Sequence, residues 1–197
     1  IDEYLHALDM MADRVREKLP EERYPLKIIK TINSYLFEDL GYTGNIHNYY
    51  NPSNSFLNDV IDSRQGIPIS LSIIYLEIAK RIDFPMVGIG MPGHFLIRPE
   101  FEGAEIFIDT FEKGEILFRQ DCEERLTKIY EHVYRQPVDL KPHFLEPVDN
   151  RQILARMLTN LKFIYVNNKE LNKALRATEG ILMLFPNHPR EIRDRGL

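Results

Sequence analysis

One stretch of the chain is apolar on most of the circumference of a predicted helix. It begins near Pro68, ends at Ile82 and is built mainly of isoleucine, leucine, tyrosine and alanine. Proline suits the first helical position, because its φ is already helical and its missing N–H would have no partner there. A helix that is apolar on several sides must be buried among other elements. The pattern therefore predicts a central buried helix over residues 68–82.

Short β-rich runs bounded by glycine or proline follow this helix, and each predicts a strand. They are MVGIG (86–90), HFLIR (94–98) and EIFID (105–109). A polar turn separates the last two, so we expect them to pair as a hairpin. Arg98 opposite Glu105 would place opposite charges across this pair, which favours that register. Alternation of side chains then puts His94 opposite Asp109 on one face of the hairpin.

The N-terminal part of the chain is predicted to be helical. Apolar residues recur at helical spacing over Asp2–Leu19 and Leu26–Leu40, and the second segment stops at Gly41, a common helix terminator. The loop that follows is rich in turn residues and contains Tyr49 and Tyr50. Loops often carry function, so these side chains could line a cleft. Polar loops are ordinarily solvated, however, and we expect this one to be exposed.

The first turn of the central helix carries a candidate nucleophile. Ser70 lies where unpaired backbone N–H groups and the positive end of the helix dipole favour developing negative charge. With His94 as the base and Asp109 orienting its ring, Ser70 could complete a catalytic triad. The simpler interpretation is that Ser70 satisfies backbone groups, while His94 and Asp109 pair without it. Ser72 faces the other side of the helix and is expected to bond back to a carbonyl.

Five segments of the sequence together resemble one family. They are Tyr49–Leu57, Gly66–Ser70 (GIPIS), Pro92–Phe95 (PGHF), Phe107–Phe111 (FIDTF) and Asp149–Leu154. This set resembles the transglutaminase-like superfamily, most of all its bacterial branch with C-terminal tetratricopeptide repeats. The resemblance covers nearly the whole chain and implies a papain-like α+β core.

The resemblance also implies what the site contains. In catalytically active members the central helix starts with a cysteine, and His and Asp follow on two adjacent strands. Here Ile69, Ser70 and Leu71 occupy the start of the central helix, and none of its residues is a cysteine. The resemblance therefore implies a protein-interaction or regulatory module with a degenerate site. The alternative is an amidase, protease or acyltransferase in which Ser70 attacks, His94 is the base and Asp109 orients it.

Cys122 is the single cysteine of the chain. We expect Asp121 to cap a helix that runs through Ile129, which would put Cys122 in its first turn and lower the pKa of the thiol. Cys122 is thus an alternative nucleophile, although it follows His94 and Asp109 in the chain, contrary to the family's order. A free cysteine is more often a small core residue.

The C-terminal part follows a proline-rich stretch from Arg135 to Pro147, which predicts an extended linker. Beyond it, residues match signature positions of a tetratricopeptide repeat, a unit of about 34 residues that pairs two antiparallel helices. These residues are Leu158, Leu161, Tyr165, Ala174 and Pro186. We expect a transglutaminase-like domain over 1–147 and tetratricopeptide-like helices over 148–197, with a second repeat incomplete. A plain helical hairpin that completes the fold is the alternative.

Composition narrows the choice of partner. A formal net charge of −5 argues against capture of nucleic acid or an anionic membrane, so we expect a protein or peptide partner.

A lone cysteine excludes an intrachain disulfide and fits a cytoplasmic location. No apolar run approaches the roughly 20 residues that cross a bilayer. No glycine-rich phosphate loop or paired histidine motif indicates a cofactor or metal.

These observations predict an α+β fold in which N-terminal helices and the central helix pack on a small antiparallel sheet. With 44% hydrophobic residues, the chain has enough apolar surface for a substantial core. The sequence leaves the oligomeric state open.

Overall fold

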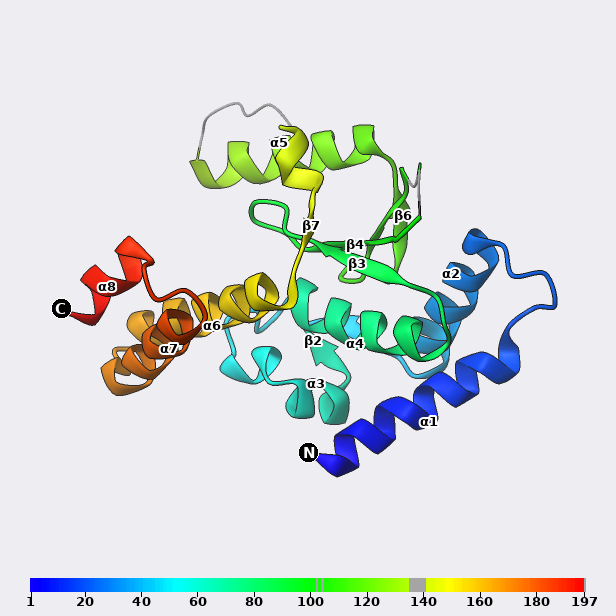
Figure 1. The fold of residues 1–197 in the computed structure, drawn as a ribbon, viewed down its shortest axis with the longest axis horizontal. Helices are drawn as coiled ribbons and strands as arrows, with labels where there is room; N and C mark the ends of the chain where they lie inside the picture. The colour runs from blue at the N-terminus through cyan, green and yellow to red at the C-terminus, as the bar shows by residue number, and fades with distance from the viewer. Residues whose placement is uncertain (102, 104, 135–140, 197) are drawn as a thin grey trace.

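The computed structural model describes residues 1–196 except 102, 104 and 135–140. The fold is mixed α+β, with a small antiparallel sheet between helices (Figure 1). Helix α4 (Pro68–Arg81) lies on one side of the sheet, and helix α5 (Arg119–Tyr134) lies on the other. The predicted α+β class is therefore confirmed.

Helices form most of the N-terminal part, as predicted. Helix α1 spans Asp2–Lys18, and α2 (Pro25–Asn33) continues as a π-helical segment, Ser34–Asp39. Gly41 follows with a φ of +74°, a left-handed conformation that suits glycine and ends the helical segment. The remaining short elements are β1 (Thr43–Gly44), a 3₁₀ turn (Pro52–Ser55), α3 (Leu57–Ser63) and β2 (Gln65–Gly66), which pairs in parallel with β1.

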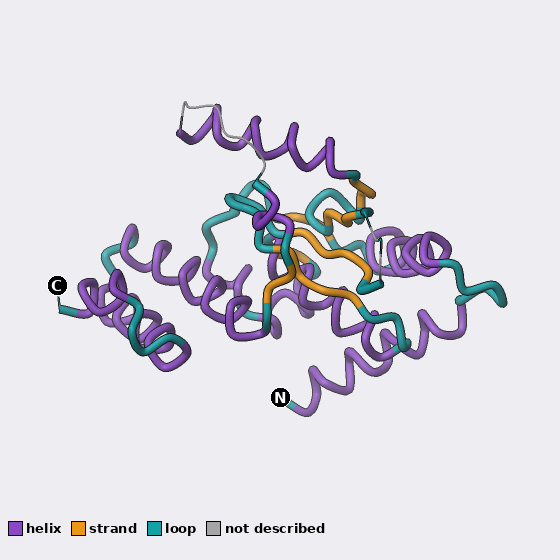
Figure 2. The backbone as a smooth tube through the Cα atoms, turned by 45° about the horizontal axis from the view of Figure 1, so that its top comes forward, coloured by secondary structure: helices purple, strands orange, loops and turns teal. Residues whose placement is uncertain are grey.

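The main sheet has the strand order β6-β5-β4-β3-β7, and its pairs are antiparallel. Figure 2 shows these strands between the helices that cover them. The strands are β3 (Met86–Ile89), β4 (Leu96–Pro99), β5 (Phe107–Asp109), β6 (Glu115–Leu117) and β7 (Pro147–Val148).

The β4–β5 hairpin differs from the predicted register by two residues. Ile97 pairs with Ile108, so Arg98 is not opposite Glu105, and His94 is not directly opposite Asp109. An exposed ion pair contributes at most about 1 kcal/mol, which is too little to set a register by itself. Because side chains alternate with a period of two, a shift of two residues leaves each side chain on the predicted face.

The two faces of the sheet belong to different apolar clusters. Phe95, Ile97 and Ile108 pack with the α4 side of the molecule. Leu96 and Phe107 pack with residues of α5 on the other side. His94 and Asp109 share the odd–even phase of this second set, so the sheet presents them toward α5.

Helix α4 is buried on several sides, as its sequence predicts. Its fully or almost fully buried residues include Ile69, Ser70, Leu71, Ser72, Ile74, Tyr75, Ile78 and Ala79. The Ser72 hydroxyl does not bond back to a carbonyl, in contrast to our expectation. It lies 2.9 Å from the Thr110 hydroxyl, which itself donates to the Pro68 carbonyl at 3.2 Å. Ser72 is therefore the donor in the first contact, and the chain of bonds ties the start of α4 to the end of β5.

The predicted extended linker is partly structured. Residues 135–140 lie outside the described residues, but Pro142–Leu145 form a 3₁₀ turn, and the short strand β7 adds to the sheet beside β3. Proline tolerates this position because β7 lies at the edge of the sheet, where one side of the strand needs no donor. The end of the segment is therefore part of the sheet and leads directly into the C-terminal helices.

Three helices end the described chain: α6 (Asn150–Asn167), α7 (Leu171–Leu184) and α8 (Pro189–Arg195). Helix α6 begins with a capping box, in which the Asp149 carboxylate accepts the Gln152 N–H at 2.8 Å. Lys162 of α6 binds Glu191 at 2.7 Å and Asp194 at 2.6 Å, which holds α8 against α6. Among the helices of the described residues, none is both long and apolar enough to span a membrane.

Candidate functional site

The site is built around Asp109, a fully buried carboxylate at the end of β5. Its Oδ1 accepts the backbone N–H groups of Phe111 at 3.0 Å and Glu112 at 3.3 Å. Its Oδ2 accepts from the Arg125 guanidinium of α5 and lies 2.6 Å from His94 Nε2. A buried charge needs such compensation, because removal from water costs several kcal/mol per ion. Asp109 therefore joins β5, α5 and the histidine loop at one point.

His94 lies in the loop that leads from β3 to β4, directly before the strand. The turn before it needs Gly93, whose φ is +72° and whose missing Cβ would lie 2.6 Å from the Ile129 side chain of α5. Arg156 of α6 holds the same loop from the other side. Its guanidinium donates to the Met91 carbonyl at 3.1 Å and to the His94 carbonyl at 2.5 Å. The imidazole is thus positioned from both α5 and α6.

The pKa of His94 is lowered from 6.5 to about 4. Burial is the largest cause, because it disfavours the charged ring, and the Arg125 and Arg156 guanidinium groups act in the same direction, while Glu112 acts against them. Asp109 also favours a charged ring, but Arg125 already neutralises its charge. His94 is therefore neutral at pH 7. A carboxylate only accepts, so Nε2 carries the proton and Nδ1 is left as an acceptor.

This lowered pKa links the site to folding. The unfolded chain takes up the His94 proton at about pH 6.5, whereas the folded chain takes it up only near pH 4. The unfolded state therefore binds more protons between these values, and the free energy of unfolding falls as the pH falls through this window.

The Ser70 hydroxyl forms its hydrogen bonds with the Ile67 backbone and not with the His94–Asp109 pair. Its hydroxyl donates to the Ile67 carbonyl and accepts the Ile67 N–H, both at 3.1 Å, and the side chain is completely buried. A Cβ at position 66 would lie 2.8 Å from Ser70 Oγ, so Gly66 permits this close packing. Among the described residues, no hydrogen bond joins Ser70 to His94. The serine satisfies the first turn of α4, which was the simpler interpretation of the sequence.

Pro68 is the residue through which α4 reaches the site. It lines an open cleft of about 830 Å³ together with His94, whereas Ser70 does not line it. The hydrogen bonds from Ser72 through Thr110 to the Pro68 carbonyl hold the start of α4 next to the end of β5. The residue that the helix start contributes to this cleft therefore has a side chain without a nucleophilic atom.

Cys122 is the fourth residue of helix α5, near the helix start as the sequence predicted, but its side chain is buried. The helix α5 begins at Arg119, and Asp121 accepts the Phe118 N–H at 2.7 Å from inside the first turn instead of capping from outside. Cys122 is fully buried beneath the sheet with Leu126. Burial raises the pKa of its thiol to about 12, so the expected lowering is wrong.

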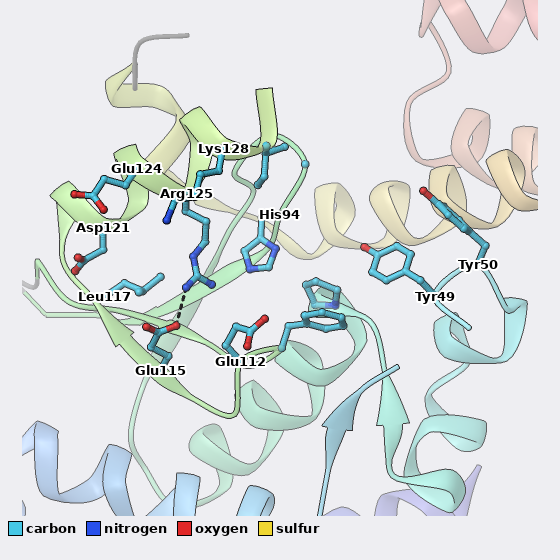
Figure 3. A pocket seen from close by; sticks show the side chains of 14 residues that line it. Tyr49, Tyr50, His94, Glu112, Glu115, Leu117, Asp121, Glu124, Arg125 and Lys128 are labelled. Carbon is cyan, nitrogen blue, oxygen red and sulfur yellow. Dashed lines mark hydrogen bonds and ion pairs between the residues drawn. The ribbon is translucent and has the colours of Figure 1, made fainter. Parts of the chain in front are cut away.

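The other wall of the cleft comes from the tyrosine loop. Tyr49 and Tyr50 line the cleft (Figure 3) together with Phe111, while Tyr50 remains largely exposed, as we expected for this loop. The buried Asn54 amide organises it by donating to the carbonyls of Asn48 at 2.8 Å and Tyr49 at 3.0 Å. Asn45 adds to this order, because its side chain donates to Asn54 Oδ1 and accepts the Asn48 N–H, both at 3.0 Å.

Sequence reasoning missed the two arginines that hold the pair. Arg125 and Arg156 lie 31 positions apart in the numbering and resemble ordinary surface residues of amphipathic helices. The only signal for Arg125 is its helical phase: it follows Cys122 by three residues and precedes Ile129 by four, so it lies on the inner side of α5. Nothing comparable distinguishes Arg156.

Comparison with known proteins identifies the family of this chain. A family model described as the transglutaminase-like superfamily matches residues 2–159. The chain belongs to this superfamily. No solved structure matches the chain.

Curated relatives come from bacteria and from animals. A UPF0162 protein of Xylella fastidiosa (strain 9a5c) is 40% identical over 176 residues, which cover 88% of this chain and 61% of the relative. The protein SirB1 of Salmonella typhimurium is 28% identical over 198 residues, covering 100% of this chain and 70% of its own. F-box only protein 21 of Homo sapiens is 33% identical over 144 residues, which are 68% of this chain and 21% of that protein. The chain thus spans about three fifths of the length of the UPF0162 relatives.

We predict that Arg125→Gln raises the pKa of His94. The substitution removes a nearby cation and leaves the Asp109 charge free to favour the protonated ring. The measurement is an NMR titration of the His94 ring protons, with a wild-type midpoint near pH 4 and a variant midpoint shifted toward higher pH. Lys128→Gln removes a cleft cation that has no ion pair with Asp109 and serves as the control. Equal shifts in both variants would contradict the assignment.

A second prediction concerns the tyrosine loop. Asn54→Ala should lower the free energy of unfolding by about 1–3 kcal/mol, because it removes the buried amide that donates to two partly buried carbonyls of the loop. Asn58→Ala, at an exposed position whose side chain donates to the neighbouring Asp59, should change it by less than about 0.5 kcal/mol. Urea unfolding followed by tyrosine fluorescence measures both. A similar change in the two variants would show that Asn54 does not organise the loop.

Proposed function

We propose that this chain is a protein-interaction or regulatory module that binds a peptide segment in a degenerate transglutaminase-like cleft. One observation carries the proposal: the start of α4 contributes Pro68 to the cleft that His94 also lines, while the Ser70 hydroxyl of the same helical turn is buried and bonded to the Ile67 backbone. Acyl transfer by this fold needs a nucleophile at that place. Without one, the remaining pair shapes and polarises a binding cleft.

The cleft has the properties of a binding site. Its volume of about 830 Å³ lies within the range of ligand pockets. Aromatic side chains of Tyr49, Tyr50 and Phe111 supply apolar contact area, and such residues dominate the energetics of interfaces. His94 is held rigidly by Asp109 and by the Arg156 contact to its carbonyl, so it offers a fixed hydrogen-bond acceptor. A rigid site loses little entropy when a peptide binds.

The C-terminal helices support an interaction role. We propose that residues 148–197 form a tetratricopeptide-like unit beside a transglutaminase-like domain of residues 1–147. In favour of this, Leu161, Tyr165 and Ala174 form a small cluster of their own. Leu158 also packs on Gly180, where a Cβ would lie 3.0 Å from the leucine. Repeats of this kind present surfaces to other proteins, and a cytoplasmic location belongs to the same proposal.

The second candidate is an amidase, protease or acyltransferase that uses Ser70, His94 and Asp109. The 2.6 Å contact between His94 and Asp109 favours it, because a base oriented in this way is what such catalysis needs. For this candidate, Ser70 must break its bonds to Ile67 and leave a completely buried position. We therefore rank it second.

Labelling with an acyl probe that reacts with activated serine or cysteine separates the two candidates. We expect no stoichiometric labelling of the wild-type chain at Ser70 or Cys122, because the serine is engaged and the thiol pKa is raised. Mass spectrometry of the intact protein and of its peptides locates any adduct. The matched set is wild type, Ser70→Ala, His94→Ala and Cys122→Ala.

Two labelling patterns would contradict the proposal. Complete labelling of the wild-type chain that is lost in both Ser70→Ala and His94→Ala would establish the serine enzyme. Labelling lost only in Cys122→Ala would assign a reactive thiol to a residue that is buried beneath the sheet.

A further inference from the structure

Carboxylates dominate the charged lining of the cleft. Glu112, Glu115, Asp121 and Glu124 line it, against Arg125 and Lys128. Arg125 is already bound to Asp109 and, at 2.6 Å, to Glu115. The described cleft therefore carries a surplus of negative charge that its own cations leave uncompensated.

Glu112 is the carboxylate closest in the chain to the His94–Asp109 pair. Its backbone N–H donates to Asp109 Oδ1 at 3.3 Å, so its position is fixed by the buried carboxylate. Among the described residues, its side chain has no hydrogen bond or ion pair. Figure 3 shows the Glu112 carboxylate next to the His94 ring inside the cleft. Nδ1 of this ring also has no partner among the described residues, so two acceptors lie together without a donor.

Aromatic rings continue from this point along the surface. Phe111 contacts Tyr49 at 5.9 Å between ring centroids, Tyr49 contacts Tyr50 at 5.3 Å, and Tyr50 contacts Phe163 of α6 at 5.9 Å. We call these four residues the aromatic row. Tyr50 and Phe163 are 64% and 54% exposed, so the row leads from the cleft to an open face of the C-terminal helices.

The cleft and the aromatic row favour the same kind of ligand group. Carboxylates and the imidazole acceptor need N–H donors, and aromatic faces attract cations. A guanidinium offers five donors in a plane and stacks on aromatic rings, whereas an ammonium group is a strongly hydrated point charge. A nucleic acid or an anionic headgroup would meet repulsion from the carboxylates.

We propose that the cleft binds an arginine of an extended peptide, with its guanidinium between Glu112 and His94 and the neighbouring residues along the aromatic row. This inference rests on the proposed peptide-binding function and names the class of its partner. Lys128 and the Arg125 and Arg156 guanidinium groups near His94 oppose the binding of a cation. Arg125 is paired with Asp109 and Glu115, however, and four carboxylates line the cleft. Within the aromatic row, the contact of Tyr50 with Phe163 holds the tyrosine loop against α6.

The test uses fluorescein-labelled peptides and fluorescence anisotropy at low ionic strength. The probe is Gly-Gly-Phe-Arg-Phe-Gly-Gly, compared with versions that carry lysine or glutamine in place of arginine. We expect the arginine peptide to bind about tenfold more tightly than the glutamine peptide, because hydrogen bonds to charged groups are the strong ones. The lysine peptide should lie between them. Affinity for the arginine peptide should fall as salt is added.

Variants distinguish the contribution of the Glu112 carboxylate from that of the aromatic row. Glu112→Gln should bring the affinity for the arginine peptide down to that of the glutamine peptide, and it should leave the glutamine peptide unchanged. Tyr50→Ala, at an exposed position, should weaken all three peptides. Glu123→Gln, on an exposed position of α5 outside this cleft, should change none of them.

Each contrary result has a defined meaning. Equal binding of the arginine and glutamine peptides, still weakened by Tyr50→Ala, overturns the arginine assignment and leaves the peptide-binding cleft intact. Absence of binding by every peptide overturns both. A loss of arginine preference in Glu123→Gln as large as that in Glu112→Gln would show that net charge, and not the cleft, causes the preference.

Discussion

The burial of the Asp109 charge is the constraint on which the site depends. A carboxylate without solvent exposure is stable only when positive charge and donors surround it, and here they come from three parts of the chain. Arg125 reaches it from α5, the backbone N–H of Phe111 reaches it from the following turn, and His94 reaches it from the preceding loop. The same contacts therefore fix the end of the sheet, the position of α5 and the orientation of the imidazole.

This arrangement extends into the C-terminal helices. Arg156 lies in α6, and its bonds to the carbonyls of Met91 and His94 brace the loop that carries the imidazole. Its guanidinium also lies 5.5 Å from the centre of the Phe95 ring, so the arginine is packed as well as hydrogen-bonded. The family match ends at residue 159, within α6, and so includes this arginine. The first part of α6 is thus structurally joined to the transglutaminase-like core.

Much of the fold follows from local patterns, and the candidate site follows only in part. The apolar circumference of residues 68–82 predicts a buried helix, and side-chain alternation places His94 and Asp109 on one face of the sheet. Alternation survives an error of two residues, which is why the faces are right although the register is wrong. Contacts made by long side chains across the fold cannot be read from a local pattern. Helical phase puts Arg125 on the inner side of α5, but it predicts neither its partner nor the role of Arg156.

Similar limits explain the remaining differences. The tyrosine loop looks solvated in the sequence because its order depends on side-chain amides, Asn54 and Asn45, that bond to each other and to loop backbone groups. Cys122 looks reactive from its place in a helix, but its orientation toward the sheet removes it from water. Ser70 and Pro68 are two residues apart in one helical turn, and only the packing of α4 decides which of them meets the cleft.

The central claim is that position 68, and not position 70, lines the cleft that contains His94. It is tested most directly by placing a cysteine at each position in a Cys122→Ala background and measuring alkylation by iodoacetamide at neutral pH. The account predicts that Pro68→Cys reacts at least about tenfold faster than Ser70→Cys, and that adding His94→Ala slows it, since a thiol beside an imidazole is activated and a buried one is not. Faster reaction of Ser70→Cys, or a reaction of Pro68→Cys that does not depend on His94, would contradict it.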